Sequence, residues 1–513
     1  MIPPSPATPH PTIQRLYLEF EEAWGNQDYK KGIGLIEKAV RKEPNDPSHV
    51  LKLAEACAAR YDFPAAERYI EKAVKLSANH TQTLEKAGQI CLGLEYVEMA
   101  FRYFRRASQK KEVSIGTLLN LVDMCIRDRR LEEAAEFLAR ADHHDPRVLF
   151  QEAALRQAQG KPQEAETLFR DLLADPATGS SARIRALYAL ADILDGTGQY
   201  DAAMAAWQEA KTLYSVHAAP FKANLQHMQS RAAEMEQTIT TAVLDRWRAE
   251  TAQLQPARRI ALLCGHPRSG TTLLEQVLDA HSDVISAEET RLMHDEAYLP
   301  IIRDLPEGTA ILPALDAASP KRLGQARNNY FSCVDRLLRQ KIGNRLLVDK
   351  NPALNLMIPI VVRIFPETKF LVALRDPRDV VMSCFMQALP LTPVSSAYLT
   401  LESAVHQYAN VMGFWLEMRP RMGDQWREVR YEEMVDDLPA VAHSVLGFLG
   451  LGYEENVLKF YEHARTKRVH SPSHADVRKP LYRTAVGRWR NYQKYLEPHL
   501  PVLERFVKEF HYE

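Results

Sequence analysis

The feature that most restricts the fold of this chain is a spacing of 34 residues that recurs in its N-terminal part. Cys57, Cys91 and Cys125 are each 34 residues apart. Small residues follow the same spacing in three further registers: Ala39, Ala73, Ala107 and Ala141; Ala66, Ala100 and Ala134; Ala54 and Gly88. Because small residues at fixed positions let neighbouring helices pack closely, this spacing predicts a series of equivalent helix-turn-helix units.

A 34-residue unit with this pattern of small residues resembles the tetratricopeptide repeat. Later units surround Ala153 and Ala191, and a weaker first unit surrounds Phe20, so we expect six repeats over residues 13–213. Such arrays form curved surfaces that bind peptides or partner proteins. The alternative is that the array is a structural spacer or a dimerising element. In the second case the protein would be a homodimer. Residues 214–257 keep a helical spacing of apolar side chains without the period, and we expect them to form a helical linker.

After Arg259 the pattern changes to short apolar segments separated by helices. Strands are expected at 260–264, 284–286, 345–348, 369–374 and 427–430. Alternating strands and helices predict a mostly parallel sheet with right-handed crossovers. The expected fold is therefore multidomain, with an all-α repeat solenoid followed by an α/β domain over residues 258–513.

The segment from Gly265 to Leu273 joins the first expected strand to a helix. A glycine-containing turn at a helix N-terminus attracts anions, because free N–H groups and the helix dipole converge there. Gly265 and Gly270 have the spacing of the Walker phosphate loop, but Thr271 stands where that loop has its lysine. Arg268 and the adjacent hydroxyls add further donors for phosphate oxygens. The segment therefore predicts a phosphate loop and argues against a nucleotide kinase.

Polar or charged residues follow the other expected strands as well. They are Glu288 and Glu289, Lys350, Arg375, and Tyr431. Ligands of parallel sheets bind beyond the carboxyl ends of the strands. We therefore expect these side chains to form one site with the phosphate loop.

These motifs resemble the sulfotransferase superfamily and, within it, the tyrosylprotein sulfotransferases. The resemblance covers roughly residues 258–495 and is carried by the segments 267–273, 278–281, 288–290, 349–352, 370–378 and 430–432, by Ser383 and Ser473, and by 477–480 and 487–489. The tandem arrangement resembles bacterial sulfotransferases that carry tetratricopeptide repeats.

The resemblance implies 3′-phosphoadenylyl sulfate as the donor and 3′-phosphoadenosine 5′-phosphate as the product. It implies that the loop residues Arg268, Ser269, Gly270, Thr271 and Thr272 hold the 5′-phosphosulfate, and that Arg375 and Ser383 hold the 3′-phosphate. It also implies that a last group closes over the nucleotide: Tyr431, Ser473, Arg478, Lys479 and Arg488. No metal is expected, since the protein itself supplies the positive charge.

Sulfuryl transfer resembles phosphoryl transfer in its in-line geometry and in the charge that moves onto the leaving group. A cation at the leaving phosphate should therefore matter most, and Lys350 is our candidate, assisted by Arg268 and Thr272. The acceptor hydroxyl needs a base within hydrogen-bond reach. The motif match implies Glu289 as this base. Glu288 is the nearest alternative, and His281 and His294 are weaker ones.

The acceptor stays open at this point. Tyrosine in a peptide or protein, a carbohydrate and a small-molecule hydroxyl all suit the same base and donor site. A repeat array is well suited to holding a polypeptide substrate. A protein of a different class, a scaffold with an inactive transferase domain, is opposed by the intact set of charged residues.

Composition and charge restrict the partners. The formal net charge of −1 argues against nucleic-acid binding driven by bulk electrostatics. We find neither an apolar run long enough to span a membrane nor a signal peptide, so we expect no membrane association and a cytoplasmic location. The six cysteines form no metal-binding pattern, and we expect them to be small buried apolar residues.

Overall fold

The computed structural model describes residues 11–94, 96–142, 145–250, 254, 258–306, 308–466, 481 and 483–512. These residues form two compact units: the first holds the chain up to Thr178 together with Arg336–Arg339, and the second holds Gly179–Asp335 and the chain from Gln340 onward.

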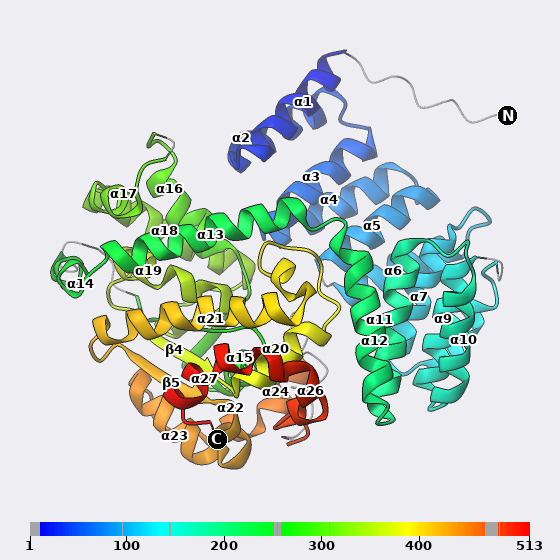
Figure 1. Cartoon of the computed structure of the whole chain (residues 1–513). Helices are drawn as coiled ribbons and strands as arrows, with labels where there is room; N and C mark the ends of the chain where they lie inside the picture. The colour runs from blue at the N-terminus through cyan, green and yellow to red at the C-terminus, as the bar shows by residue number, and fades with distance from the viewer. Residues whose placement is uncertain are drawn as a thin grey trace. The chain divides into compact units, whose positions relative to one another are not determined.

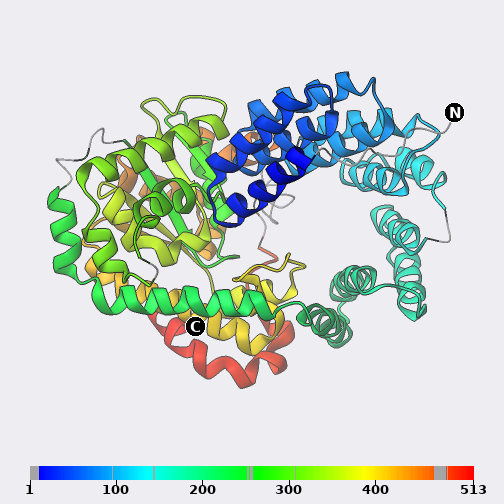
Figure 2. The same cartoon turned by 90° about the horizontal axis from the view of Figure 1, so that it is seen from above.

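The first unit is a series of helix pairs (Figures 1 and 2). The pairs are α1 (Pro11–Gly25) with α2 (Tyr29–Lys42), α3 (Pro47–Ala59) with α4 (Phe63–Leu76), α5 (Thr81–Gly93) with α6 (Val97–Ser108), α7 (Ile115–Arg127) with α8 (Leu131–Leu138), and α9 (Pro146–Ala158) with α10 (Pro162–Ala174). This array confirms the all-α repeat fold that the 34-residue spacing predicts.

Local sequence explains both the turns and the close packing of these pairs. Asp28 and Asp62 precede α2 and α4, and each carboxylate accepts a hydrogen bond from the third following N–H, which stabilises the helix start. On α5, a Cβ atom at Gly88 would lie 2.5 Å from the ring of Phe104 on α6. The small residue that recurs at this position therefore leaves room for a side chain of the neighbouring helix.

The sixth helix pair belongs to the second unit. It consists of α11 (Ser180–Gly196) and α12 (Tyr200–Ser215), and it is followed by α13 (Ala219–Thr238) and α14 (Thr241–Ala249). Helix α13 lies along α21 (Leu401–Met418), where Gln229 donates a hydrogen bond of 3.0 Å to Gln407. The expected linker is thus largely helix that packs on the α/β part of the second unit.

Within the described residues, the second unit contains one five-stranded parallel sheet. Its strands are β1 (Ile260–Gly265), β2 (Val284–Glu288), β3 (Leu346–Lys350), β4 (Lys369–Leu374) and β5 (Trp426–Arg430), in the order β2-β3-β1-β4-β5. This confirms the parallel α/β fold. The chain proceeds from β1 toward one edge and later toward the other, so the loop after β1 lies where the connections diverge.

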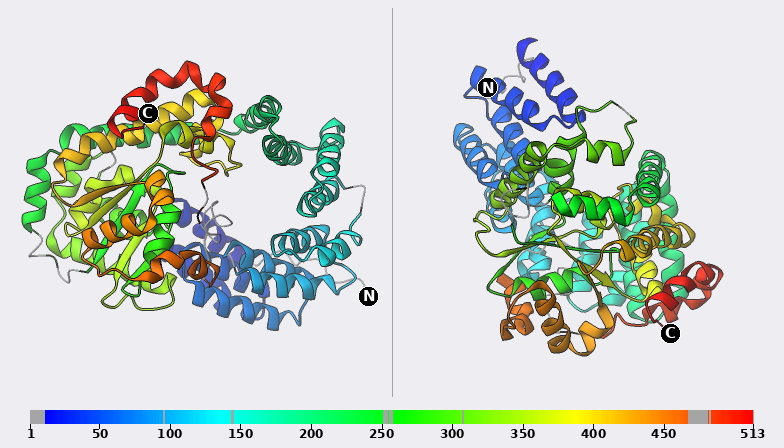
Figure 3. Two further views of the ribbon diagram at one scale, coloured as in Figure 1. Left: turned by 90° about the horizontal axis from the view of Figure 1, so that it is seen from below. Right: turned by 90° about the vertical axis from the view of Figure 1, so that its left-hand side faces the viewer.

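Helices cover both faces of this sheet, as the left view of Figure 3 shows. The apolar core on one face joins strand residues such as Leu263 and Val348 to α15 (Thr271–Asp279), α22 (Tyr431–Asp436), α23 (Leu438–Leu449) and α24 (Phe460–Thr466). On the other face, α18 (Pro320–Leu337) and α21 place Tyr330 against Asp349 and Trp415 against Glu428. Further α-helices among the described residues of the unit are α16 (Leu299–Ile302), α17 (Ile311–Asp316), α19 (Ile358–Ile364), α20 (Pro377–Met386), α26 (Gln493–Leu496) and α27 (Leu500–Glu509).

All six cysteines are free and buried, which confirms their expected role as small apolar residues. Among the helices that the structure describes, none combines the length and the apolar character needed to cross a membrane.

Candidate active site

A cavity of about 1040 Å³ lies at the carboxyl ends of the strands, inside the second unit. Its walls come from the phosphate loop, from residues that follow β2 to β5, and from α20. Asp195 of α11 and Arg488 of the C-terminal segment (residues 483–512) also line it. The cavity therefore lies where parallel α/β sheets bind their ligands.

The phosphate loop, residues 265–270, turns sharply between β1 and α15. Its backbone is left-handed at Arg268 (φ 70°) and at Gly270 (φ 91°). A Cβ atom on Gly270 would lie 2.8 Å from the Tyr431 ring, and one on Gly265 would lie 2.5 Å from the carbonyl oxygen of Ala373. Because glycine alone fits these positions, the loop stays tight. The first N–H groups of α15, which have no acceptors in their own helix, belong to residues that line the cavity.

The expected phosphate-binding residues of this loop divide into two groups. Arg268, Gly270, Thr271 and Thr272 line the cavity. Ser269 is buried outside the lining, and its N–H donates a hydrogen bond of 3.2 Å to the His266 carbonyl. Its role in the loop is thus to close the turn.

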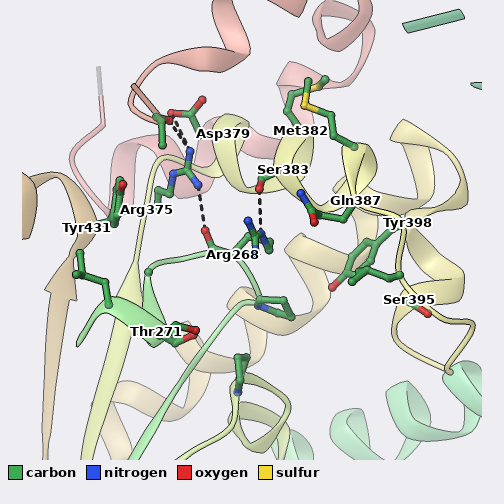
Figure 4. A pocket seen from close by; sticks show the side chains of 18 of the residues that line it. Arg268, Thr271, Arg375, Asp379, Met382, Ser383, Gln387, Ser395, Tyr398 and Tyr431 are labelled. Carbon is green, nitrogen blue, oxygen red and sulfur yellow. Dashed lines mark hydrogen bonds and ion pairs between the residues drawn. The ribbon is translucent and has the colours of Figure 1, made fainter. Parts of the chain in front are cut away.

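Arg268, Ser383 and Arg375 form a contiguous group of donors on one wall (Figure 4). Arg268 Nε donates to Ser383 Oγ at 3.1 Å, and Arg375 Nη1 donates to the Arg268 carbonyl at 3.2 Å. Arg375 also lies over the Tyr431 ring, 5.1 Å from its centroid. Among the described residues, the buried Arg375 Nε has no hydrogen-bond partner. The wall therefore offers two guanidinium groups and a hydroxyl, a set suited to phosphate oxygens.

The C-terminal segment is hydrogen-bonded to this wall. Asp379 of α20 accepts hydrogen bonds from the N–H groups of Gly487 at 2.7 Å and Trp489 at 2.8 Å, and Arg375 Nη2 donates to the Ala485 carbonyl at 2.5 Å. These bonds hold Arg488 at the cavity. Its guanidinium pairs there with Asp195.

Asp195 is a cavity residue that the sequence reasoning missed. Nothing in the local sequence distinguishes it from the other acidic residues on the repeat helices. Its position follows from the packing of the sixth helix pair on the C-terminal segment.

Lys350 is fully buried at the end of β3 and does not line the cavity. Its Nζ lies 2.7 Å from Glu289 Oε1, 3.1 Å from Glu288 Oε1 and 3.4 Å from Glu275 Oε2. Burial lowers the pKa of Lys350, but the three carboxylates outweigh burial and raise this pKa above its ordinary value. The lysine therefore stays an ammonium that binds the carboxylates together.

The two adjacent glutamates differ in exposure. Glu289 lines the cavity with 38% of its side chain exposed, whereas the Glu288 side chain is 4% exposed and lies outside the lining. Glu289 has a left-handed backbone (φ 47°), and its N–H donates to the Lys350 carbonyl at 2.7 Å. Such strain is costly for a non-glycine residue. It turns Glu289, and not Glu288, toward the cavity.

The histidines weighed as alternative bases do not line the cavity. His281 is buried, with Nε2 2.9 Å from the Gly452 carbonyl and Nδ1 accepting from the Asp283 N–H at 3.0 Å. His294 Nδ1 lies 2.8 Å from Asp295. Ser473, Arg478 and Lys479, which the resemblance assigns to the donor site, lie outside the described residues.

The other wall of the cavity is largely apolar. Its residues come from α20 and the segment after it: Met382, Met386, Leu389, Pro390, Val394 and Tyr398. Figure 4 shows Met382 and Tyr398 on either side of Gln387. No sequence pattern distinguishes this wall, because apolar residues after a helix are as typical of a core as of a ligand pocket. One cavity thus combines a cationic wall, a carboxylate and an apolar wall.

Comparison with known proteins gives two family matches. Residues 261–455 match the sulfotransferase family, and residues 17–81 and 150–218 match the tetratricopeptide repeat. The chain is 26% identical over 392 residues to an uncharacterized protein of Aquifex aeolicus, covering 74% of this chain and 49% of that protein. It is 25% identical over 204 residues to a putative protein-tyrosine sulfotransferase of Caenorhabditis briggsae, covering 39% of this chain and 68% of that protein. The match thus spans about half the length of the Aquifex protein.

Among solved structures, the chain matches the sulfotransferase domain from the olefin synthase of Synechococcus PCC 7002. The TM-score is 0.34 at 22% identity, and the alignment covers 46% of this chain and 90% of that one.

Proposed function

We propose that this chain, which carries a sulfotransferase-family domain joined to tetratricopeptide repeats, transfers a sulfuryl group from 3′-phosphoadenylyl sulfate to an aromatic hydroxyl. The observation that carries the proposal is the combination, in one cavity, of a phosphate loop, the Arg268–Ser383–Arg375 group and the carboxylate of Glu289.

The cationic wall fits a donor that carries two separate anionic groups. The phosphate loop with Arg268 and Thr272 would hold the 5′-phosphosulfate, and Arg375 with Ser383 would hold the 3′-phosphate. Two observations support this fit: Arg375 Nε is buried without a partner among the described residues, and the cradle at Gly270 has room for no Cβ. Tyr431 and Arg488 would close over the nucleotide, together with Ser473 and Lys479.

Glu289 would act as the general base. It takes the proton of the acceptor hydroxyl while the acceptor oxygen forms its bond to sulfur and the bond from sulfur to the 5′-phosphate oxygen breaks. A positioned base of this kind contributes about 10²- to 10⁴-fold to the rate. Its exposure in the cavity, compared with the buried Glu288, favours it for this role.

Lys350 would neutralise the charge that collects on the leaving phosphate. In the structure its ammonium binds Glu289, so this role requires the ammonium to exchange that carboxylate for a phosphate oxygen. The exchange would at the same time release Glu289 to accept a proton. Donor binding and activation of the base would then be one event.

The apolar wall favours an acceptor whose hydroxyl is carried by an aromatic ring, such as tyrosine in a peptide. Met382, Met386 and Leu389 offer apolar contacts for such a ring. The putative protein-tyrosine sulfotransferase among the relatives supports the same class. The repeats would hold the polypeptide that carries the tyrosine.

The test is calorimetric titration with 3′-phosphoadenosine 5′-phosphate. We expect micromolar or tighter binding to the full chain, and loss of detectable binding in Arg375→Ala. Arg419→Ala is the matched control, since Arg419 binds Glu428 and Glu509 and does not line the cavity. No binding by the unaltered chain would contradict the donor assignment and favour a scaffold. Turnover of labelled donor with tyrosine peptides and with a panel of sugars then distinguishes the acceptor classes.

A further inference from the structure

The sixth helix pair reaches the cavity through Asp195, near the end of α11. One carboxylate oxygen, Oδ2, accepts from the guanidinium of Arg488. The other, Oδ1, accepts from the Tyr492 hydroxyl at 2.5 Å. The Asp195 side chain is 15% exposed, so its carboxylate is largely shielded from solvent, and its bond to the Arg488 guanidinium is charge-assisted.

Arg488 is thereby held from two sides. It starts the 3-10 helix η7 (Arg488–Tyr492), whose backbone is fixed by Asp379 of α20. Its side chain, 41% exposed, pairs with Asp195 of α11. A long side chain with this exposure would otherwise sample several rotamers, so the carboxylate determines where the guanidinium lies.

Aromatic rings pack between η7 and the sixth pair. The buried ring of Tyr492 lies 5.7 Å from Trp207 and 5.4 Å from Tyr200, both on α12. Edge-on and tilted aromatic contacts at these distances add to the apolar burial. Helices α11 and α12 therefore support η7 and, through it, the position of Arg488.

We propose that Asp195 is a positioning residue for donor binding, which holds the Arg488 guanidinium at the cavity before the nucleotide arrives. The inference rests on the proposed function, because it takes Arg488 as a donor contact. Orienting a cation in advance removes an ordering cost from binding. The sixth repeat-type helix pair is then a working part of the donor site, and any ligand that displaces α11 changes donor affinity.

The experiment measures the affinity of the full chain for 3′-phosphoadenosine 5′-phosphate in Asp195→Asn, Arg488→Ala and the double variant. The matched control is Asp201→Asn, because Asp201 joins the same helix pair to the same C-terminal segment through Lys494 (2.7 Å) and Tyr495 (3.0 Å) but does not line the cavity.

We expect Asp195→Asn to weaken binding on the order of tenfold, Asp201→Asn to leave it unchanged, and the effect of Asp195→Asn to vanish in the Arg488→Ala background. An unchanged or tighter affinity in Asp195→Asn would overturn the inference. So would an equal loss with and without Arg488, because a general loosening of α11 does not depend on that guanidinium. Absence of binding by the unaltered chain would instead contradict the proposed function itself.

Discussion

The ammonium of Lys350 donates a hydrogen bond to the carboxylate of Glu289, with Nζ and Oε1 2.7 Å apart. Lys350 ends β3, and Glu289 comes directly after β2. These two strands are neighbours in the sheet, so the strand pairing itself brings the two residues together. Glu289 faces the cavity and Lys350 lies behind it.

Replacing Glu289 by glutamine should abolish transfer and spare donor binding. The amide keeps the shape of the side chain but cannot take the acceptor proton, so we expect turnover to fall about 10²- to 10⁴-fold. Affinity for 3′-phosphoadenosine 5′-phosphate should be retained or rise, because the neutral amide competes with the phosphate for the Lys350 ammonium less than the carboxylate does. Glu288→Gln is the matched control and should retain transfer, because Glu288 lies outside the cavity. Full turnover in Glu289→Gln would refute its role as the base.

Replacing Lys350 by methionine should destabilise the protein in a pH-dependent way. The change leaves the buried carboxylates of Glu275 and Glu288 without their cation, a loss of about 3–5 kcal/mol for a buried pair. Without the ammonium, the folded-state pKa of these carboxyls rises, so the deficit is largest near neutral pH and shrinks as they take up protons in acid.

Unfolding by denaturant at a series of pH values measures this deficit. Lys369→Met is the control, since Lys369 donates to the Phe448 carbonyl at 2.5 Å. A deficit in Lys350→Met that stays constant across pH would contradict the assignment of the carboxylates.

Lys211 should make the stability of the protein rise with pH. Burial on α12 lowers the pKa of Lys211 from 10.5 to about 7, where its ammonium donates to the Gln387 carbonyl at 3.3 Å. Between these two values the unfolded chain binds more protons than the folded one, so stability increases as pH rises through this window. The slope is up to about 1.4 kcal/mol per pH unit for one group.

The comparison is with Lys211→Met, which keeps the apolar stem and lacks the charge. We expect the unfolding free energy of the unaltered chain to climb relative to this variant from neutral to alkaline pH. Parallel pH profiles for the two proteins would show that Lys211 keeps its ordinary pKa.

Replacing Gly270 by alanine should weaken donor binding. The residue has a φ of 91°, and the added Cβ would meet the Tyr431 ring at 2.8 Å. Either the loop or Tyr431 must shift, and both line the cavity, so we expect at least roughly a tenfold loss of affinity for 3′-phosphoadenosine 5′-phosphate. Gly324→Ala on α18, which has open space around it, should leave affinity unchanged. Equal affinities for both variants would contradict the tight fit at Gly270.

Most of the fold could be predicted from local patterns. The 34-residue spacing predicts the helix pairs, because each pair meets its neighbours in the same way and needs a small residue at the same place, as Gly88 opposite Phe104 illustrates. The strands and the phosphate loop follow likewise from apolar runs and glycines that act within a few residues. Because the strands run parallel, their carboxyl ends lie at the same edge of the sheet.

The details of the site required the tertiary structure. A sequence of two adjacent glutamates is symmetric, and the left-handed backbone at Glu289 decides which one is exposed in the cavity. The burial of Lys350 behind it depends on α15, which contributes Glu275.

By itself, then, the sequence determined a repeat array, a parallel α/β domain and the kinds of charged groups at its strand ends. These depend on short-range periodicity and on the general rules of strand connection. The tertiary structure alone decided that the sixth helix pair belongs to the second unit and that Asp195 meets Arg488. That contact joins segments distant in the chain, and its energy comes from packing and charge pairing that no local pattern records.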